Sequence, residues 1–478
     1  MMADGGFTLL CTLHSALCTL HSALCTRGDI VPTALTPSVV PGTNFATSGT
    51  IRDALYDLIP VSEPEVELIS TPAFLRLERI QQLGFVSRVW PGAKHARYEH
   101  SLGVMHLARL AVAHLRQRPE GRFITDEDAR TVVAAALLHD IGHYPFSHAI
   151  EELGPPVLSH EAVGRSIILS AEIAGILERS WRVDPERVAN IIYPGKHELP
   201  EVDRTLRGIL SGPLDVDKLD YLPRDASACN VPYGGVDSSR LIDSMRIASV
   251  DGELIRKIVV SEKGISPLHS LINARQEMFD NVYWHHTNRA CMAMLLRAIQ
   301  EAMIAGAIEA DTLTQHDDAS LLAVLATPEM PESTRKLTAA LRDRHFHKRA
   351  VEISSRATDL YARLGALFYQ PASRRRVEIA MVEQLRKLTG ETVPDDAILI
   401  DIPKPEKWRT DVWVEFTDPP IGMQRLMPWR TVVGLGDEEL KRYEEHRRLI
   451  RLVVAEPYRD RVRAEWERLL YPLIGGIV

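Results

Sequence analysis

Residues 134–150 read AAALLHDIGHYPFSHAI, an apolar run that leads directly into three histidines and an aspartate. The apolar side chains up to Leu138 predict a helix that enters a core, and His139 and Asp140 follow at its end. Buried imidazole and carboxylate groups are costly unless a partner satisfies them. The segment therefore predicts a helical fold whose core borders a polar site.

His139 and Asp140 can converge on one metal ion if the fold supplies further ligands. His143 lies one helical turn after His139, so both would project from one face if the helix continued. Imidazole with carboxylate suits Mn, Fe or Zn, or Mg where carboxylate and water dominate. A His-Asp pair alone is weak support, because either residue can also serve as a helix cap or a satisfied core group.

The overall charge of the chain argues against a general nucleic-acid-coating surface, since 64 acidic residues outnumber 56 basic ones. A local basic pocket for an anionic ligand remains compatible with the net charge of −8. No apolar run approaches the roughly 18 residues of a membrane span. Cys229 and Cys291 are the only cysteines beyond residue 25, so no disulfide framework is predicted and a cytoplasmic location is expected.

Residues 1–50 are expected to be an extension outside the fold, disordered or non-native. Residues 11–26 repeat the unit CTLHSAL without change, which is typical of duplicated or read-through coding sequence. A zinc site is the weaker alternative, with Cys11, His14, Cys18 and His21 as ligands. The following residues are rich in Pro, Thr, Gly and Ser and predict a linker. We expect the fold to begin near Ile51 and a chain starting near Thr47 to behave like the full protein.

The fold class predicted is mostly α, with a helical domain over residues 51–330 and a smaller α+β region over residues 331–478. Thr71 and Thr125 are predicted N-caps, with Pro72 at a first helical position and Gly84 just past the end of that helix. Further helices are predicted over residues 100–118, 159–180, 215–224 and 266–307. In the C-terminal region, strands are predicted at 347–354, 397–403 and 411–416, and a helix over 437–470.

Two further patches carry charged and aromatic side chains. PGAKHARYEHSLG, residues 91–103, places a lysine, two histidines and an arginine at the start of a helix, where phosphate binding is favoured. LDVDKLDYLPRDA, residues 214–226, sets Asp217 and Tyr221 one helical turn apart. By itself the second patch is equally compatible with a solvated helix face.

With these patches the chain resembles the HD-domain phosphohydrolases, which are named for adjacent His and Asp metal ligands. Within them it is most similar to the deoxynucleoside triphosphate triphosphohydrolase branch. The resemblance rests on segments in the same order: RIQQLGFVSRVWPGAKHARYEHSLGVMHLA, LLHDIGHYPFSH, SHEAVG and LDVDKLDYLPRDA. It covers residues 51–297 well and implies that the helical domain is an HD domain.

The resemblance implies one divalent ion per site, Mn, Fe, Mg or Zn. Its implied ligands are His100, His139, Asp140 and Asp217. The resemblance also places His143 and His148 beside the scissile phosphate. His160 matches a general acid with Glu151 as its acidic partner, because a neighbouring carboxylate raises the proton affinity of an imidazole.

The resemblance also implies a substrate site. Arg97, Lys218 and Arg275 would bind the triphosphate. Gln82 and Asp225 would contact the 3′-hydroxyl of the sugar.

Three more positions complete the implied substrate site. Tyr221 and Tyr283 would pack near the phosphates and the sugar, and Leu83 would crowd the 2′ position, which favours deoxyribose. Simple core packing is the alternative for Tyr283.

The implied reaction is water attack at the α-phosphorus of a deoxynucleoside triphosphate (dNTP), which releases deoxynucleoside and triphosphate. The expected partners are the dNTP and further copies of the chain in a dimer or tetramer, with no membrane and no strong nucleic-acid signal. Two alternatives stay open: hydrolysis of a nucleoside monophosphate, cyclic nucleotide or alarmone, and non-catalytic nucleotide sensing. Ser70, Leu75 and Glu78 stand where relatives activated by guanine nucleotides carry other polar and charged residues, which argues against such activation at this surface.

Overall fold

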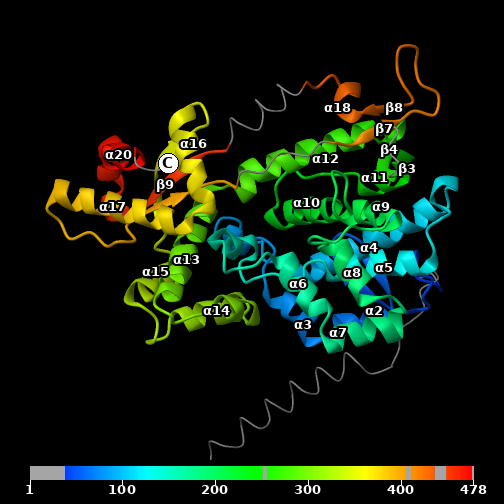
Figure 1. Cartoon of the computed structure of the whole chain (residues 1–478), viewed down its shortest axis with the longest axis horizontal. Helices are drawn as coiled ribbons and strands as arrows, with labels where there is room; N and C mark the ends of the chain where they lie inside the picture. The colour runs from blue at the N-terminus through cyan, green and yellow to red at the C-terminus, as the bar shows by residue number, and fades with distance from the viewer. Residues whose placement is uncertain (1–37, 251–255, 405–410, 437–447, 476–478) are drawn as a thin grey trace, which may run out of the picture.

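The computed structural model describes residues 38–250, 256–404, 411–436 and 448–475. The CTLHSAL repeat with its alternative zinc ligands lies outside these residues, as does the first part, 437–447, of the helix predicted over 437–470. Figure 1 shows helices α16, α17 and α20 gathered at one end of the molecule and α4, α5 and α10 at the other.

The first part of the chain is mainly helical. Its α-helices are α2 (Glu63–Ile69), α3 (Pro72–Leu75), α4 (Arg97–Arg116), α5 (Asp126–Leu138), α6 (His160–Ile168), α7 (Ala171–Ile176), α8 (Pro185–Ile192), α9 (Glu201–Leu210), α10 (Val216–Cys229), α11 (Ser238–Ser244) and α12 (Ile265–Met278). Its shorter 3₁₀ and π segments are η1 (Arg76–Arg79), η2 (Gly84–Arg88), η3 (Pro119–Gly121), η4 (Ser147–Leu153), η5 (Leu177–Trp181), η6 (Glu262–Gly264) and η7 (Phe279–Tyr283).

The second part contains further helices between its strands. They are α13 (His286–Ile304), η8 (Ala310–Gln315), α14 (Asp318–Leu325), α15 (Glu332–Arg342), α16 (Thr358–Ala366), η9 (Leu367–Tyr369), α17 (Pro371–Thr389), α18 (Trp429–Val432), η10 (Glu456–Tyr458) and α20 (Arg459–Ile474). Among the described residues, no helix is both long and apolar enough to cross a membrane.

Helix α5 runs through the centre of the largest hydrophobic core. Thr125 caps its N-terminus by accepting the backbone N–H of Asp128, as predicted. Every residue from Val132 to Leu138 is 0% exposed, because the apolar run packs against neighbouring helices on all sides. The helix therefore ends inside the protein, and His139 is its C-cap residue. Since α5 stops there, His143 does not follow His139 on a helical face.

Three small sheets flank the helices in the part of the chain that the structure describes. The first is the hairpin of β1 (Thr47–Asp53) and β2 (Asp57–Ser62). The second has the order β3 (Met245–Ser249), β4 (Arg256–Ser261), β7 (Trp413–Glu415) and β8 (Leu426–Pro428). The third has β9 (Ile450–Val454) between β5 (Lys348–Ile353) and β6 (Ile398–Asp401). The fold is mostly α with a smaller α+β C-terminal part, as predicted.

The prediction of a helix over residues 437–470 is wrong for residues 450–454. These residues, IRLVV, form the central strand β9 and are all buried. A run of aliphatic and β-branched side chains buried on both faces suits a central strand better than an amphipathic helix. The later part of the prediction is confirmed, since α20 occupies Arg459–Ile474.

The strand predicted at 411–416 does not belong with the other predicted C-terminal strands. β7 pairs in parallel with β4, and Val414 is fully buried in the core of the first part of the chain. One sheet therefore contains strands from both sides of the boundary expected near residue 331: β3 and β4 precede it, and β7 and β8 follow it.

Several predicted helices are interrupted. Thr71 caps α3 as predicted, but the helix continues only as η1, and Gly84 opens η2 instead of ending the helix. Ile80 adopts an extended backbone with φ −110° and ψ 111°, which ends the helical segment. Likewise, residues 159–180 divide into α6, α7 and η5, and residues 266–307 divide at Trp284 between η7 and α13.

Residues 38–50 belong to the fold, so the boundary expected near Ile51 lies too late in the chain. Val40 is fully buried, and strand β1 begins at Thr47. Gly42 has φ +82°, and a Cβ there would lie 2.8 Å from the backbone oxygen of Arg109, so this segment packs directly on α4. Asn44 adds a hydrogen bond of 3.0 Å to Asp126.

We expect a chain that starts at Ser38 to melt like the full protein, and a chain that starts at Thr47 to melt at a lower temperature. The shorter chain loses the burial of Val40, which stabilises the fold by about 1.5–3 kcal/mol. Thermal unfolding followed by circular dichroism measures the difference. Equal melting temperatures for the two chains would show that residues 38–46 do not stabilise the fold.

Candidate active site

Three separate segments bring the predicted metal ligands together. His100 lies on α4, His139 and Asp140 directly follow α5, and Asp217 lies in the first turn of α10. His100 Nε2 lies 3.1 Å from Asp217 Oδ1 and 3.7 Å from Asp140 Oδ2. His139 Nε2 lies 3.3 Å from Asp140 Oδ1 and 3.8 Å from Asp217 Oδ1. The side chains therefore converge on one shared point.

The second ring nitrogen of each histidine fixes its orientation. Nδ1 of His139 donates to the carbonyl oxygen of Ala136 at 2.8 Å, and Nδ1 of His100 lies 2.8 Å from Asp220 Oδ2. With Nδ1 as the donor, Nε2 of each ring presents its lone pair to the shared point. Within the described part of the chain, His139 Nε2 is buried and has no hydrogen-bond partner. Two imidazoles, two carboxylates and an unsatisfied lone pair fit a divalent cation.

The carboxylates around the shared point favour a positive charge there. Burial lowers the pKa of His100, but its contacts with Asp217 and Asp220 outweigh burial and raise the pKa to about 10. Burial raises the pKa of Asp140, but the charges of Arg97, His139 and His143 together outweigh burial, and the pKa lies well below its usual range. The pKa of Asp217 falls to about 2 despite burial, because His100 hydrogen-bonds to it. Ionised carboxylates of this kind are ready to bind a metal ion.

Asp220 is a site residue that the sequence analysis missed. It is fully buried, contacts His100, and accepts hydrogen bonds from Arg224 Nε and the Tyr56 hydroxyl, each at 2.8 Å. Its carboxylate therefore orients the His100 ring, as outer-sphere partners of metal ligands do. Asp220 follows Asp217 by one helical turn, and this spacing was the signal that could have identified it.

We expect Asp220→Asn to lower the affinity for a divalent metal by about 10–100-fold. The neutral amide weakens the hydrogen bond that holds the His100 ring in place. Competition with a chromophoric chelator measures the affinity, and Asp343→Asn at an exposed surface position is the matched control. Unchanged metal affinity in a folded Asp220→Asn protein would rule out this orienting role.

The predicted catalytic residues form a second cluster beside the metal ligands. His143 Nε2 lies 3.2 Å from Asp140 Oδ1, and the His143 ring stacks on His160 with centroids 3.8 Å apart. His160 Nδ1 lies 2.6 Å from Glu151 Oε1, and His148 Nδ1 lies 3.7 Å from the same oxygen. The side chain of His148 is 66% exposed, so the cluster leads from the buried ligands to solvent.

Glu151 favours the protonated form of His160. Burial lowers the pKa of His160, but the hydrogen bond and the charge of Glu151 outweigh burial and raise the pKa. Burial raises the pKa of Glu151, but its contacts with His148 and His160 outweigh burial and keep the pKa well below its usual range. The pKa of His143 lies well below its usual range because of burial and the nearby charges of Arg97 and His160. The two stacked imidazoles thus differ in proton affinity, and His160 has the higher one.

Residues from distant segments hold the backbone between α5 and α6. Phe146 and Ser147 have φ of 57° and 62°, which is unfavourable for residues other than glycine. Asp318 on α14 accepts the backbone N–H of Phe146 at 2.7 Å and that of Gln81 at 3.0 Å. The Ser147 hydroxyl lies 2.9 Å from the carbonyl oxygen of Gln81 and 3.0 Å from that of Gln82. This loop and the turn before η2 are thereby fixed to each other.

The predicted triphosphate ligands lie on three helices. Arg97, at the start of α4, is buried, pairs with Asp140 and donates to the Ser147 hydroxyl at 3.1 Å. Lys218 on α10 donates to the carbonyl oxygen of Gly212 at 3.0 Å. Arg275, in the last turn of α12, lies close enough for its charge to act on Lys218. The structure therefore places Lys218 and Arg275 near each other, whereas Arg97 pairs with Asp140, a predicted metal ligand.

The predicted sugar contacts lie next to the same helices. The rings of Tyr221 and Tyr283 lie 6.3 Å apart, and Tyr221 lies 6.5 Å from the His100 ring. The Tyr283 hydroxyl donates to Asp225 at 2.7 Å, and His95 Nε2 lies 2.7 Å from the other carboxylate oxygen of Asp225. His95 is thus a further candidate site residue, one of the two histidines in the patch of residues 91–103, to which the sequence assigned no separate role.

Gln82 and Leu83 lie in the turn before η2. The backbone N–H of Gln82 donates to the carbonyl oxygen of His95 at 3.0 Å, which joins this turn to the segment before α4. Its side-chain Oε1 is buried and has no hydrogen-bond partner among the described residues. An acceptor of this kind can receive a hydrogen bond from a ligand hydroxyl. Leu83 is half-buried against the main core.

Comparison with known proteins identifies two families in this chain. The HD domain family matches residues 97–222, and the HD associated region matches residues 236–418. An uncharacterized protein of Methanocaldococcus jannaschii is 33% identical over 280 residues, which cover 58% of this chain and 55% of that protein. The human deoxynucleoside triphosphate triphosphohydrolase SAMHD1 is 30% identical over 284 residues, which cover 54% of this chain and 45% of that protein.

A solved structure has the same fold. The crystal structure of a hypothetical protein from Aquifex aeolicus matches with a TM-score of 0.65 and 24% identity, covering 87% of this chain and 99% of that one. The chain spans about half the length of the curated relatives described above.

The chain carries an HD domain followed by an HD-associated region, and it resembles the SAMHD1 branch of HD-domain phosphohydrolases, as its motifs predicted. The match to the HD domain spans all four predicted metal ligands.

Proposed function

We propose that this chain is a metal-dependent hydrolase that cleaves dNTPs into deoxynucleoside and triphosphate by water attack at the α-phosphorus. The observation that carries the proposal is the convergence of the four metal ligands beside the pair of His160 and Glu151. A nucleotide sensor needs no proton donor, so this pair favours hydrolysis over sensing alone. Relatives named as dNTP triphosphohydrolases, at 28% and 30% identity, support the choice of substrate.

The residues of the site have separate roles in this reaction. A divalent ion, held by His100, His139, Asp140 and Asp217, would polarise the phosphoryl oxygen and lower the pKa of an attacking water. His160 donates its proton to the 5′ oxygen of the departing deoxynucleoside when the bond to the α-phosphorus breaks. Glu151 keeps that proton on His160 before the transfer. Lys218 and Arg275 bind the negative charge of the triphosphate.

Contacts with the sugar select a deoxynucleotide. Gln82 and Asp225 bind the 3′-hydroxyl, and Leu83 occupies the space that a 2′-hydroxyl would need. Ribonucleoside triphosphates should therefore be poor substrates, because their extra hydroxyl meets an apolar side chain. Assembly of the chain into a dimer or tetramer is part of the same proposal.

Product analysis tests the reaction. The protein is incubated with Mn²⁺ and each of the four dNTPs, and the products are separated by anion-exchange chromatography. Deoxynucleoside and triphosphate are expected, because the bond between the 5′ oxygen and the α-phosphorus breaks. Deoxynucleoside monophosphate and pyrophosphate would show that the bond between the α- and β-phosphates breaks instead, which would contradict the proposal. The same assay with the four ribonucleoside triphosphates tests the role of Leu83, because slow hydrolysis is expected if this side chain excludes the 2′-hydroxyl.

Parallel assays examine the alternatives. Turnover of a nucleoside monophosphate, a cyclic nucleotide or an alarmone without turnover of dNTPs would replace the proposed substrate. Binding of metal and nucleotide with no turnover at all would favour a sensor.

A further inference from the structure

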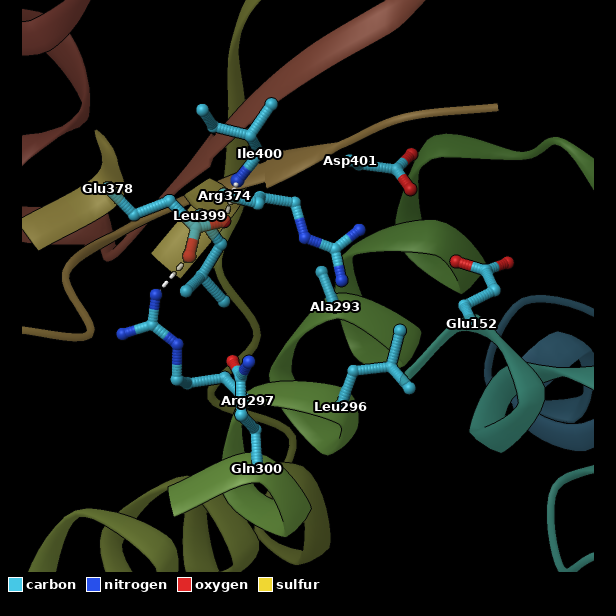
Figure 2. A pocket seen from close by; sticks show the side chains of 10 residues that line it. All are labelled: Glu152, Ala293, Leu296, Arg297, Gln300, Arg374, Glu378, Leu399, Ile400 and Asp401. Carbon is cyan, nitrogen blue, oxygen red and sulfur yellow. Dashed lines mark hydrogen bonds and ion pairs between the residues drawn. The ribbon is translucent and has the colours of Figure 1, made fainter. Parts of the chain in front are cut away.

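A pocket outside the candidate active site lies between α13, α17 and β6 (Figure 2). It has a volume of about 310 Å³, including open solvent at its mouth. Apolar side chains such as Leu296 and Leu399 form part of its wall, and Gln300 and charged side chains form the rest. Glu152 of η4 also lines it, whereas the preceding Glu151 contacts His160 in the active-site cluster.

Each acidic side chain in the wall already has an arginine partner. Glu378 pairs with Arg297 and also accepts the backbone N–H of Ile400 at 2.7 Å. Arg289, which lies behind the wall, pairs with Asp401 at 2.6 Å and with Glu152 at 2.9 Å. Arg289 thus serves two carboxylates, and Asp401 has a further cation nearby, because Arg451 lies 3.9 Å from its Oδ2.

Arg374 on α17 differs from these paired charged side chains. It is 7% exposed, and within the described part of the chain its guanidinium makes no hydrogen bond or ion pair. Figure 2 shows this guanidinium pointing into the pocket between Asp401 and Ala293. Its neighbours on α17 differ, since Arg375 pairs with Glu301 at 2.7 Å and Arg376 is exposed. Its nitrogen atoms are not among the buried ones that lack a partner, so the guanidinium meets the solvent of the pocket, where it is available to an anion from outside the chain.

We propose that this pocket binds a small oxyanion, a carboxylate or a phosphate group, with Arg374 as its principal ligand. The planar guanidinium offers paired N–H donors that match two oxygens of either group. The apolar side chains of the wall strengthen the attraction by keeping water away from it. Glu152 of the pocket and Glu151 of the active-site cluster are successive residues of η4, but no residue that lines the pocket belongs to the proposed dNTP site.

The test compares Arg374→Met with Arg376→Met, which removes an exposed arginine from the same helix. Titrations use inorganic phosphate and propionate in a Tris chloride buffer with EDTA, so that no metal competes for the anion. We expect saturable binding by the wild type and Arg376→Met in calorimetry, and binding at least about tenfold weaker by Arg374→Met. Arg374→Lys, which keeps the charge but loses the planar fork, should fall between them.

Thermal unfolding supplies a second readout. Without phosphate or propionate, Arg374→Met should melt no lower than the wild type, because no ion pair is lost. Tighter binding of phosphate identifies a phosphate ligand, and tighter binding of propionate identifies a carboxylate. The proposal is overturned if the wild type binds neither anion, or if Arg374→Met binds as well as the wild type. Marked destabilisation or failure to fold in Arg374→Met, with a normal Arg376→Met, would also overturn it, since Arg374 would then have a structural partner.

Discussion

Asp140→Ala is expected to remove the bound divalent ion and abolish hydrolysis while the chain remains folded. Asp140 lies within reach of both His139 and His100, so its loss leaves the remaining ligands without the carboxylate at their centre. Metal stoichiometry, turnover and thermal unfolding, measured on the same preparation, check the three parts of this expectation.

The matched variant for this test is Asp140→Asn. Asp140 also pairs with the buried Arg97, and removal of one partner of a buried ion pair costs about 3–5 kcal/mol. The asparagine keeps a hydrogen-bond acceptor for Arg97 but not the ligand charge, so loss of metal can be separated from loss of stability. Full activity in a metal-free Asp140 variant would refute the proposed metal dependence.

His160→Ala is expected to lower turnover by about 10²–10⁴-fold, the range for a lost general acid. Metal content and nucleotide affinity should stay nearly unchanged, because Glu151 and His143 are partners of His160, and no hydrogen bond, ion pair or ring contact in the described part of the chain joins it to a predicted metal ligand. Metal analysis, equilibrium binding and steady-state kinetics decide the role. Loss of metal would make His160 a ligand, and unchanged turnover would leave it as only a structural residue at the start of α6.

Glu151→Gln should cause a smaller loss and change the pH profile. A proton donor loses activity as the pH rises through its pKa, and the Glu151 carboxylate raises the pKa of His160. The neutral glutamine removes this effect, so the basic limb of the profile should move to lower pH. Glu161→Gln is the control, because Glu161 lies farther from His160, at 3.6 Å, and should give a smaller shift in the same direction. An unchanged basic limb in Glu151→Gln would exclude this dyad as the titrating group.

The sequence alone was sufficient for features that depend on short stretches of chain. The Thr125 cap and the apolar run after it predicted α5 and its burial, because capping and side-chain periodicity act within a few residues. The motif residues His139 and Asp140 predicted the metal site, since their chemistry requires a partner wherever they are buried. The resemblance supplied the ligands His100 and Asp217, and the structure brings them to the same point.

Only the tertiary structure revealed features that depend on contacts between distant residues. Asp220 became a site residue because α10 packs against α4 and presents its carboxylate to His100. Asp318 holds the loop at Phe146, from which it is 172 residues away, through a backbone contact that no local pattern encodes. The segment IRLVV became a strand because β5 and β6 pair with both its edges and two hydrophobic clusters cover its faces, while an isolated aliphatic run is equally compatible with a helix. Helix ends and ligand chemistry are thus local properties of this sequence, whereas pairing partners and burial are set by how its elements pack.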